Sequence, residues 1–139
     1  MPKYSFDTCT DLLYGYYLDG SAEAKQALTN VIDDLLYYFG NESSIRLYRG
    51  LSFRTAKQRI AFITSLGDQL MLNEQYVSSW STSSNIAQCF AKRKKYGIVI
   101  SFTVPKRVAA DLRVLKFNNE LEYILPPGSY KLDKFTLIR

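Results

Sequence analysis

The amino-acid sequence predicts an α+β fold in which helices come first and strands follow. Through the first 44 residues apolar side chains recur every three or four positions, which is the period of an amphipathic helix. From residue 45 onward, short runs of β-branched and aromatic residues alternate with turn residues, a pattern typical of mixed or antiparallel sheets. With 139 residues, of which 47% are hydrophobic, the chain is expected to form one domain. Its helical part is predicted at 1–44 and its strand-rich core at 45–139.

Four helices are predicted. The clearest begins after Ser21, a good N-cap residue, and ends at Gly40, with Leu28, Leu35 and Phe39 on one side. A shorter helix is expected over 11–18. A third is expected from Thr55 to about Met71, with Ala56, Ile60, Ile63 and Leu70 forming its apolar stripe and Gly67 near its end. The fourth begins at Ser84, presents Ile86, Ala87, Phe90 and Ala91, and runs into the basic segment 92–95.

Strands are predicted over 45–50, 75–83, 98–104, 112–117, 121–125 and 134–138. One strand contains two acids one residue apart, Glu120 and Glu122, followed by a Pro-Pro-Gly turn. Residues i and i+2 of a strand share a face, so the two carboxylates are expected to point the same way. A solvated sheet edge that discourages aggregation is the alternative explanation for such charges.

Composition excludes several classes of chemistry. The sequence has no histidine, which rules out histidine-dependent triads and histidine-ligated zinc. Its formal charge of +5 favours anionic partners. Cys9 and Cys89 are too few and too far apart for a disulfide framework, and we expect free thiols in a reducing compartment. No secretory signal and no run of about 20 apolar residues is present, so a cytoplasmic protein without membrane contact is predicted.

Three motifs stand in a fixed order along the chain. An arginine follows a strand-like run in Leu-Tyr-Arg49-Gly50; Ser81-Thr82-Ser83 leads into a helix with the pattern Ala87-x-x-Phe90-Ala91; and Glu120-x-Glu122 precedes Leu-Pro-Pro-Gly. Together they resemble the arginine, serine-threonine-serine, glutamate-x-glutamate signature of mono-ADP-ribosyltransferases of the cholera and clostridial binary toxin branch. The resemblance implies an ADP-ribosyltransferase-like fold, with N-terminal helices and two packed sheets around a cleft for NAD⁺, and it implies no metal.

The resemblance also implies roles for individual residues. Glu122 would stabilise the sugar cation that forms when the bond to nicotinamide breaks, with Ser81 holding its carboxylate. Arg49 would bind the NAD⁺ phosphates and ribose, and Gly50 and Thr82 are assigned to the same site. Phe90 is expected to stack on nicotinamide or to pack in the core, and Arg93 to reach a phosphate. Glu120 would orient the acceptor, and Phe117, Asn118 and Asn119 would contact it.

The predicted reaction transfers ADP-ribose to an arginine of a target protein, because glutamate at the first acidic position accompanies arginine acceptors in this family. Transfer to an RNA or DNA base stays open, because the run Lys92 to Lys95 is basic, and so does hydrolysis of NAD⁺ by water. A basic nucleic-acid-binding module with a structural acidic pair is the non-enzymatic alternative. The short, basic chain looks like a phage-encoded or intracellular bacterial enzyme, including toxins that an antitoxin or immunity protein inhibits.

Overall fold

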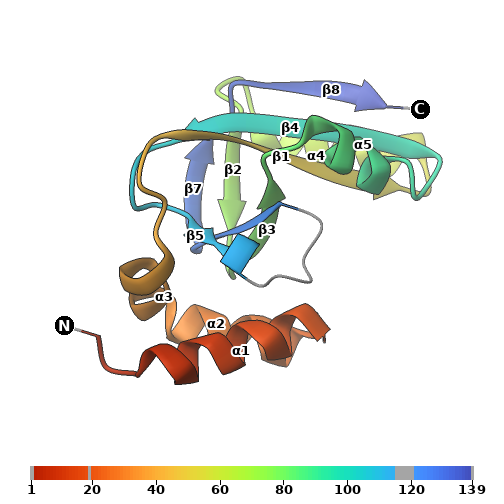
Figure 1. Cartoon of the computed structure of the whole chain (residues 1–139). Helices are drawn as coiled ribbons and strands as arrows, with labels where there is room; N and C mark the ends of the chain where they lie inside the picture. The colour runs from red at the N-terminus through yellow and green to blue at the C-terminus, as the bar shows by residue number, and fades with distance from the viewer. Residues whose placement is uncertain (1, 19, 115–120, 139) are drawn as a thin grey trace.

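A layer of helices lies beside two antiparallel sheets in the computed structural model, which describes residues 2–18, 20–114 and 121–138 (Figure 1). The α+β class and the order of helices before strands are confirmed. All pairings between the described strands are antiparallel. Within the described residues, no helix has the length and apolar character needed to cross a membrane.

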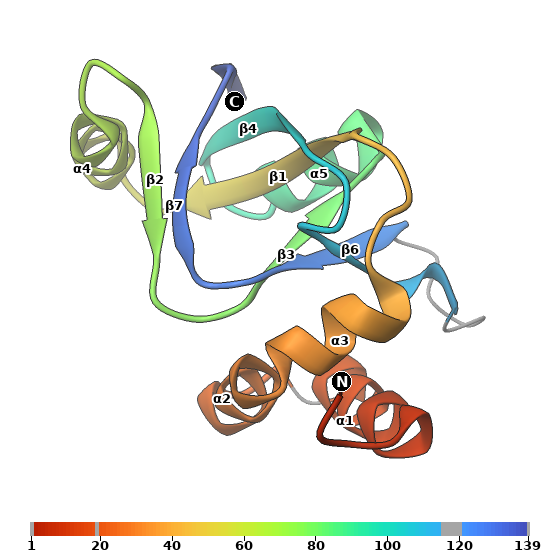
Figure 2. The ribbon, with the colours of Figure 1, turned by 90° about the vertical axis from the view of Figure 1, so that its left-hand side faces the viewer.

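The helical layer consists of α1 (Phe6–Leu18), α2 (Ala22–Asn30) and α3 (Ile32–Phe39), which lie together on one side of the sheets (Figure 2). Ser21 caps α2 as predicted, accepting a hydrogen bond from the Ala24 amide at 3.2 Å. Asp34 of α3 is buried, and its carboxylate accepts hydrogen bonds from the backbone amides of Lys3 and Tyr4. These bonds attach the start of the chain to the layer.

The larger sheet has six strands in the order β5-β6-β3-β1-β4-β8. Their bounds are β1 (Ile45–Phe53), β3 (Ser78–Ser81), β4 (Tyr96–Val104), β5 (Ala110–Asp111), β6 (Glu122–Leu125) and β8 (Lys134–Ile138). The smaller sheet pairs β2 (Met71–Glu74) with β7 (Gly128–Lys131). Two further helices, α4 (Ala56–Leu66) and α5 (Ser84–Ala91), connect strands of these sheets.

Two apolar clusters hold the layers together. The first joins α1, α2 and α3 to the sheet through Val77, Ala110, Leu112 and Ile124. The second contains Leu47, Trp80, Ile100, Tyr123 and other residues of the large sheet, and α4 and the small sheet pack against it. Strand β6 contributes to both clusters because its side chains alternate, with Ile124 toward the helices and Tyr123 and Leu125 toward the second cluster.

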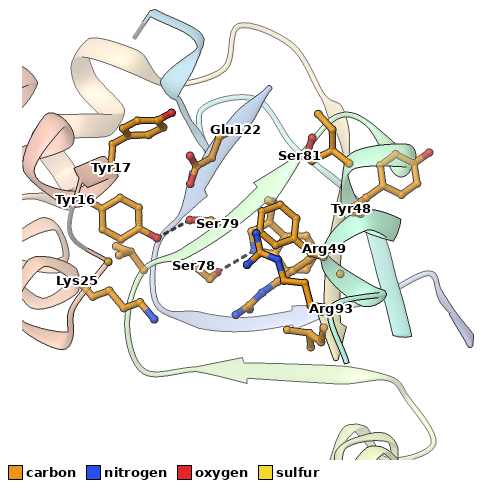
Figure 3. Close-up of a pocket in the computed structure, with 18 residues that line it drawn as sticks. Tyr16, Tyr17, Lys25, Tyr48, Arg49, Ser78, Ser79, Ser81, Arg93 and Glu122 are labelled. Carbon is orange, nitrogen blue, oxygen red and sulfur yellow. Dashed lines mark hydrogen bonds between the residues drawn. The ribbon is translucent and has the colours of Figure 1, made fainter. Parts of the chain in front are cut away.

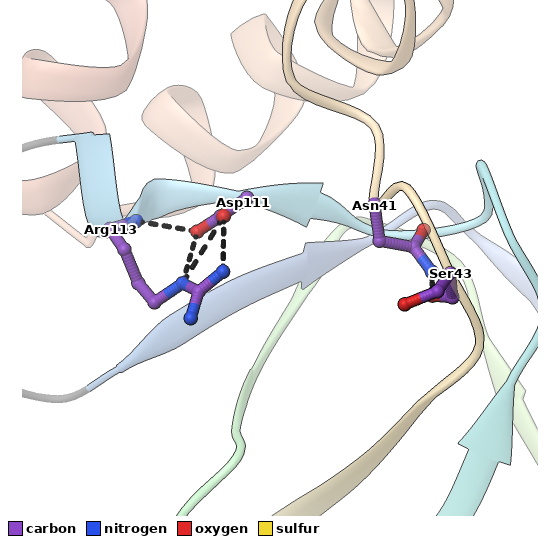
Figure 4. Close-up of polar contacts among 4 residues, drawn as sticks. All are labelled: Asn41, Ser43, Asp111 and Arg113. Atoms are coloured by element: carbon purple, nitrogen blue, oxygen red, sulfur yellow. Dashed lines mark hydrogen bonds and ion pairs between the residues drawn. The ribbon is translucent and has the colours of Figure 1, made fainter.

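The junction between the helical layer and the sheets depends on Asn41, which is buried (Figure 4). Its Nδ2 donates hydrogen bonds to the carbonyls of Ser43 and Pro105 at 2.7 and 2.9 Å. Its Oδ1 accepts from the amides of Val108 and Ala109, each at 3.0 Å. One side chain therefore connects the end of the helical layer to the segment that leads into β5.

Several predicted boundaries are wrong. The helix expected from Ser21 to Gly40 is two helices, because Val31 has φ −116° and ψ 19° and breaks the α conformation. The helix expected over 11–18 begins earlier, at Phe6, where the Ser5 hydroxyl accepts from the Thr8 amide. The helix expected to reach Met71 ends at Leu66, because Gly67 has φ 68°. Ile60, expected on its apolar stripe, is 61% exposed.

The strand predictions also need correction. Strands β2 and β7 were missed, and the run predicted over 75–83 contains only β3. The strand predicted over 112–117 is wrong for its first three residues, which form a 3₁₀ turn (Leu112–Val114). The strand predicted from 121 begins at Glu122, since Leu121 has φ 50° and is not extended. The prediction for 134–138 is confirmed.

Candidate functional site

A cavity of about 670 Å³ lies where two neighbouring strands of the large sheet move apart. Strands β1 and β3 share a single register pair, Tyr48 with Ser81, whereas β3 and β6 pair over four positions. Beyond that pair the two strands diverge, and residues 49–51 of one and 78–80 of the other line the cavity. Its volume falls within the range of about 300–1,000 Å³ that is usual for small-molecule sites.

Side chains from both faces of the sheet reach this cavity. Directly paired residues point to the same side of a sheet and neighbours along a strand alternate, so Tyr48, Ser81 and Glu122 share one face. Arg49 and Trp80 extend from the other face, with the Arg49 Cζ 5.9 Å from the Trp80 ring centroid. The gap between the strands brings both sets to one space, which a continuous sheet would have kept apart.

Glu122 is the acidic residue of the cavity lining. It is the first residue of β6 and pairs in register with Ser81 of β3, and both residues are buried, with exposed fractions of 8% and 6%. Ser81 Oγ accepts a hydrogen bond from the Ser83 amide at 3.0 Å, which orients the hydroxyl at the strand end. The pairing of β6 with β3 places Glu122 in a largely water-excluded position, where its charge acts strongly.

Three cations face that one carboxylate across the cavity: Lys25 from α2, Arg49 from β1 and Arg93 from the turn after α5 (Figure 3). The lining is therefore suited to an anionic ligand with a localised positive centre. Arg49 forms an ion pair through Nη1 with Glu74 of β2. A guanidinium has five N–H donors in a planar fork, so this pair fixes its orientation and leaves donors for a ligand.

Tyr130 of β7 lies near the Glu74 carboxylate that pairs with Arg49. Burial raises the pKa of Tyr130 to about 12, and the nearby Glu74 carboxylate adds to the rise. The phenol therefore stays neutral at physiological pH and donates its hydrogen bond to the Pro126 carbonyl at 2.5 Å. Because β2 pairs with β7 from Met71 to Glu74, the small sheet positions the carboxylate that holds Arg49.

Helix α5 forms a second wall, and two glycines let it lie directly on the strands. A Cβ on Gly50 would stand 1.7 Å from the Ala87 carbonyl oxygen, and one on Gly97 would stand 2.1 Å from that of Ala91. Gly50, which the resemblance assigns to the NAD⁺ site, lines the cavity, and the requirement for glycine comes from this backbone contact. Because α5 lies so close, its residues Ile86, Ala87 and Phe90 reach the cavity.

Phe90 and Arg93 both line the cavity, and they stack on each other. The Arg93 Cζ lies 4.0 Å from the centroid of the Phe90 ring, a close cation–π contact. One face of the ring is therefore covered by the guanidinium. The sequence predicted separate roles, with Phe90 on nicotinamide and Arg93 on a phosphate. Their contact indicates instead that the two side chains would meet a ligand together.

The structure does not bring every predicted residue to the cavity. Thr82 is the first residue after β3 and is not part of the cavity lining. Its amide donates a hydrogen bond to the Leu121 carbonyl at 3.3 Å, just beyond the paired residues of β3 and β6. Phe117, Asn118, Asn119 and Glu120 lie outside the described residues. Leu121, which precedes Glu122, has a left-handed backbone and is not part of β6.

Helix α1 supplies functional candidates that sequence reasoning assigned to packing. Tyr16 and Tyr17 line the cavity, and the Tyr16 hydroxyl lies 2.5 Å from the Ser79 hydroxyl (Figure 3). Lys25 reaches in from the same layer. The tyrosine cluster of this helix was visible in the sequence, but its position opposite β3 depends on the tertiary packing of the layer.

No protein-family model matches this chain, and a search of curated proteins finds no similar sequence. The site therefore has to be interpreted from its own residues and geometry.

Proposed function

We propose that this protein is a mono-ADP-ribosyltransferase with an ADP-ribosyltransferase-like fold, which uses NAD⁺ as co-substrate and releases nicotinamide. The observation that carries the proposal is the convergence of Arg49, Ser81 and Glu122 on one cavity. These residues are separated by 32 and 41 positions, respectively, along the chain. Each belongs to a different motif of the family that the sequence resembles.

The charges of the cavity suit two groups of NAD⁺, the diphosphate and the nicotinamide ribose. Arg49, Arg93 and Lys25 provide positive charge for a diphosphate, and the Arg49 fork matches phosphate geometry better than a lysine would. Among the described residues of the lining, Glu122 provides the single negative charge. With Glu122 on β6, and with Arg49 on β1 and Arg93 after α5, the dinucleotide would lie with its sugar toward β6 and its phosphates toward β1 and α5.

Glu122 would act on the developing charge of the nicotinamide ribose. The bond between ribose C1′ and the nicotinamide nitrogen breaks, the neutral nicotinamide leaves with the bonding electrons, and positive charge grows on the sugar. A carboxylate held beside that sugar stabilises the transition state more than the ground state. An acceptor nitrogen then donates its electron pair to C1′ and loses a proton, which completes the transfer.

The arginine acceptor depends on Glu120, with Phe117, Asn118 and Asn119 contacting the target protein. These four residues lie outside the described part of the chain, so protein arginine stays a prediction of the sequence. The phage or bacterial setting and an inhibitory antitoxin are proposals that rest on the resemblance, and the cytoplasmic location is a proposal that rests on the sequence. Hydrolysis of NAD⁺ is the same chemistry with water as acceptor.

The proposal is tested by incubating the purified protein with NAD⁺ labelled on the adenylate, with and without a bacterial extract. Nicotinamide release is measured by chromatography, and the label is located after separate protease and nuclease treatments. We expect nicotinamide release together with a labelled macromolecule. Release without a labelled macromolecule would indicate hydrolysis, and absence of release under both conditions would refute the proposal.

A further inference from the structure

A second hollow, of about 590 Å³, lies on the surface between α4 and the turn that joins α5 to β4. Five of the six residues that line it are cationic, and the sixth is aromatic: Arg59, Lys92, Arg93, Lys94, Lys95 and Tyr96. Among the described residues, no carboxylate is part of this lining. We call this site the basic hollow. It concentrates positive charge at one place in a protein whose total charge is +5.

The charges of the basic hollow are held in place by the fold. The Arg59 Nη1 donates hydrogen bonds to the carbonyls of Gly97 and Ile138, at 3.0 and 3.1 Å. Its guanidinium also lies 5.3 Å from the Tyr96 ring centroid, and the Lys95 Nζ lies 5.5 Å from it. Lys92 to Lys95 are exposed, and no ion pair involving them is found among the described residues. Their charges therefore face solvent, and no carboxylate in the described part of the chain neutralises them.

The basic hollow and the cavity meet at one residue, since Arg93 lines both. A chain of phosphates bound in the hollow would therefore continue toward the space where Glu122 lies. The same positive charge disfavours a basic, arginine-containing peptide in that position, because like charges would be brought together.

We infer that the basic hollow binds the backbone phosphates of a single-stranded nucleic acid and thereby presents an unpaired base to the cavity as acceptor. Regularly spaced phosphates match a row of lysines and arginines, whichever base each nucleotide carries. We infer a single strand and not a duplex, because a base in a duplex is paired and stacked and its nitrogens cannot reach the cavity. This inference rests on the proposed function for its chemistry, and it replaces protein arginine as acceptor.

The group transfer balances without a further reactant. The C1′–nicotinamide bond breaks, and nicotinamide leaves with the bonding pair. A nitrogen of the base donates its pair to C1′, and its proton passes to solvent.

Binding is tested with the full-length protein and a fluorescently labelled 12-nucleotide single-stranded RNA, by anisotropy across a series of KCl concentrations, with a DNA strand of the same sequence as a parallel probe. If four to five cations contact phosphates, log Kd should change with log salt with a slope of about 3. The variant Lys92→Gln/Lys94→Gln/Lys95→Gln should reduce that slope by about 2, because each lost contact removes about 0.7. Arg93 is left unchanged because it also lines the cavity.

The matched control is Lys106→Gln/Lys131→Gln/Lys134→Gln, which removes the same charge at exposed lysines that line neither site. It should keep the wild-type slope. An equal loss in both variants would overturn the inference, since the effect would then come from net charge. Binding of a poly-glutamate peptide as tight as that of RNA at each salt concentration would also overturn it, in favour of an acidic protein partner.

Two measurements separate this inference from the proposed function. Nicotinamide release without nucleic acid should be the same for the wild type and the Lys92/Lys94/Lys95 variant, while transfer of labelled ADP-ribose to the oligonucleotide should be lost in that variant. Labelling of protein but never of the oligonucleotide would overturn the acceptor inference and keep the proposed function. RNA binding at the hollow without any nicotinamide release would overturn the acceptor step and the proposed function, and leave a nucleic-acid-binding site.

Discussion

Replacing Gly50 with alanine tests how closely α5 must lie on β1 to form the cavity. The new Cβ would stand 1.7 Å from the Ala87 carbonyl oxygen and 2.8 Å from the Ala91 amide nitrogen, and both are backbone atoms. Restoring a separation of about 3.0 Å requires the helix to move by about 1.3 Å. Overpacking of this kind typically costs about 1–3 kcal/mol.

We therefore expect Gly50→Ala to lower the free energy of unfolding by about 2 kcal/mol and Tm by about 5–10 °C. Urea denaturation followed by circular dichroism measures the first quantity, and calorimetry measures the second. Because α5 carries Phe90 and Arg93 into the cavity, the displaced helix should also weaken NAD⁺ binding in the protein that remains folded.

Gly15→Ala is the matched control. Gly15 lies within α1, and a Cβ there would meet no atom within 4 Å. Alanine is favoured over glycine inside a helix by about 0.5–1 kcal/mol, so this variant should be as stable as the wild type or slightly more stable. The packing argument is refuted if Gly50→Ala unfolds with the same free energy as the wild type.

Three further outcomes are expected. Arg49→Lys should raise the KM for NAD⁺ about tenfold with a smaller change in kcat, because the charge is kept while the planar fork is lost. Tyr16→Phe and Ser79→Ala should each destabilise the protein by about 1 kcal/mol, and a double-mutant cycle measured by urea denaturation should give a coupling of similar size. In native protein Cys89 should react with a thiol reagent while Cys9 stays protected, because Cys9 is fully buried and burial, with the Asp34 charge, raises its pKa.

For each of these three predictions, one result would contradict the reasoning. Arg46→Lys is the control for the first, because Arg46 lies on the same strand, pairs with Asp133 and does not line the cavity; an equal rise in KM in both variants argues against a specific role for Arg49. A coupling near zero would show that the two hydroxyls do not interact in solution. Reaction of two thiols per native molecule would place Cys9 outside the core.

The parts of the fold that were predictable depend on local signals. Ser21 and Thr55 begin helices because their hydroxyls accept hydrogen bonds from amides three residues later, and Gly67 ends one because its backbone is left-handed. The break at Val31 carries no comparable signal. It divides one helical pattern into two helices that both pack against the sheet, which is decided by tertiary contacts.

Only part of the candidate site was predictable, and its shape was not. Arg49, Ser81 and Glu122 were identifiable from the order of three motifs. The cavity exists because β1 and β3 pair at one position and then diverge, which no periodicity in either strand indicates. Glu74, which holds Arg49, lies on a four-residue strand too short to show an alternating pattern.

The central claim is that Glu122 stabilises the positive charge that develops on the ribose of NAD⁺. The measurement that tests it is the rate of nicotinamide release by Glu122→Gln compared with Glu42→Gln, an exposed control with the same change of side chain. We predict a loss of about 10²–10³-fold in kcat for Glu122→Gln, with NAD⁺ affinity by calorimetry close to that of the wild type, and no loss for the control. Nicotinamide release by Glu122→Gln at the wild-type rate would contradict the account.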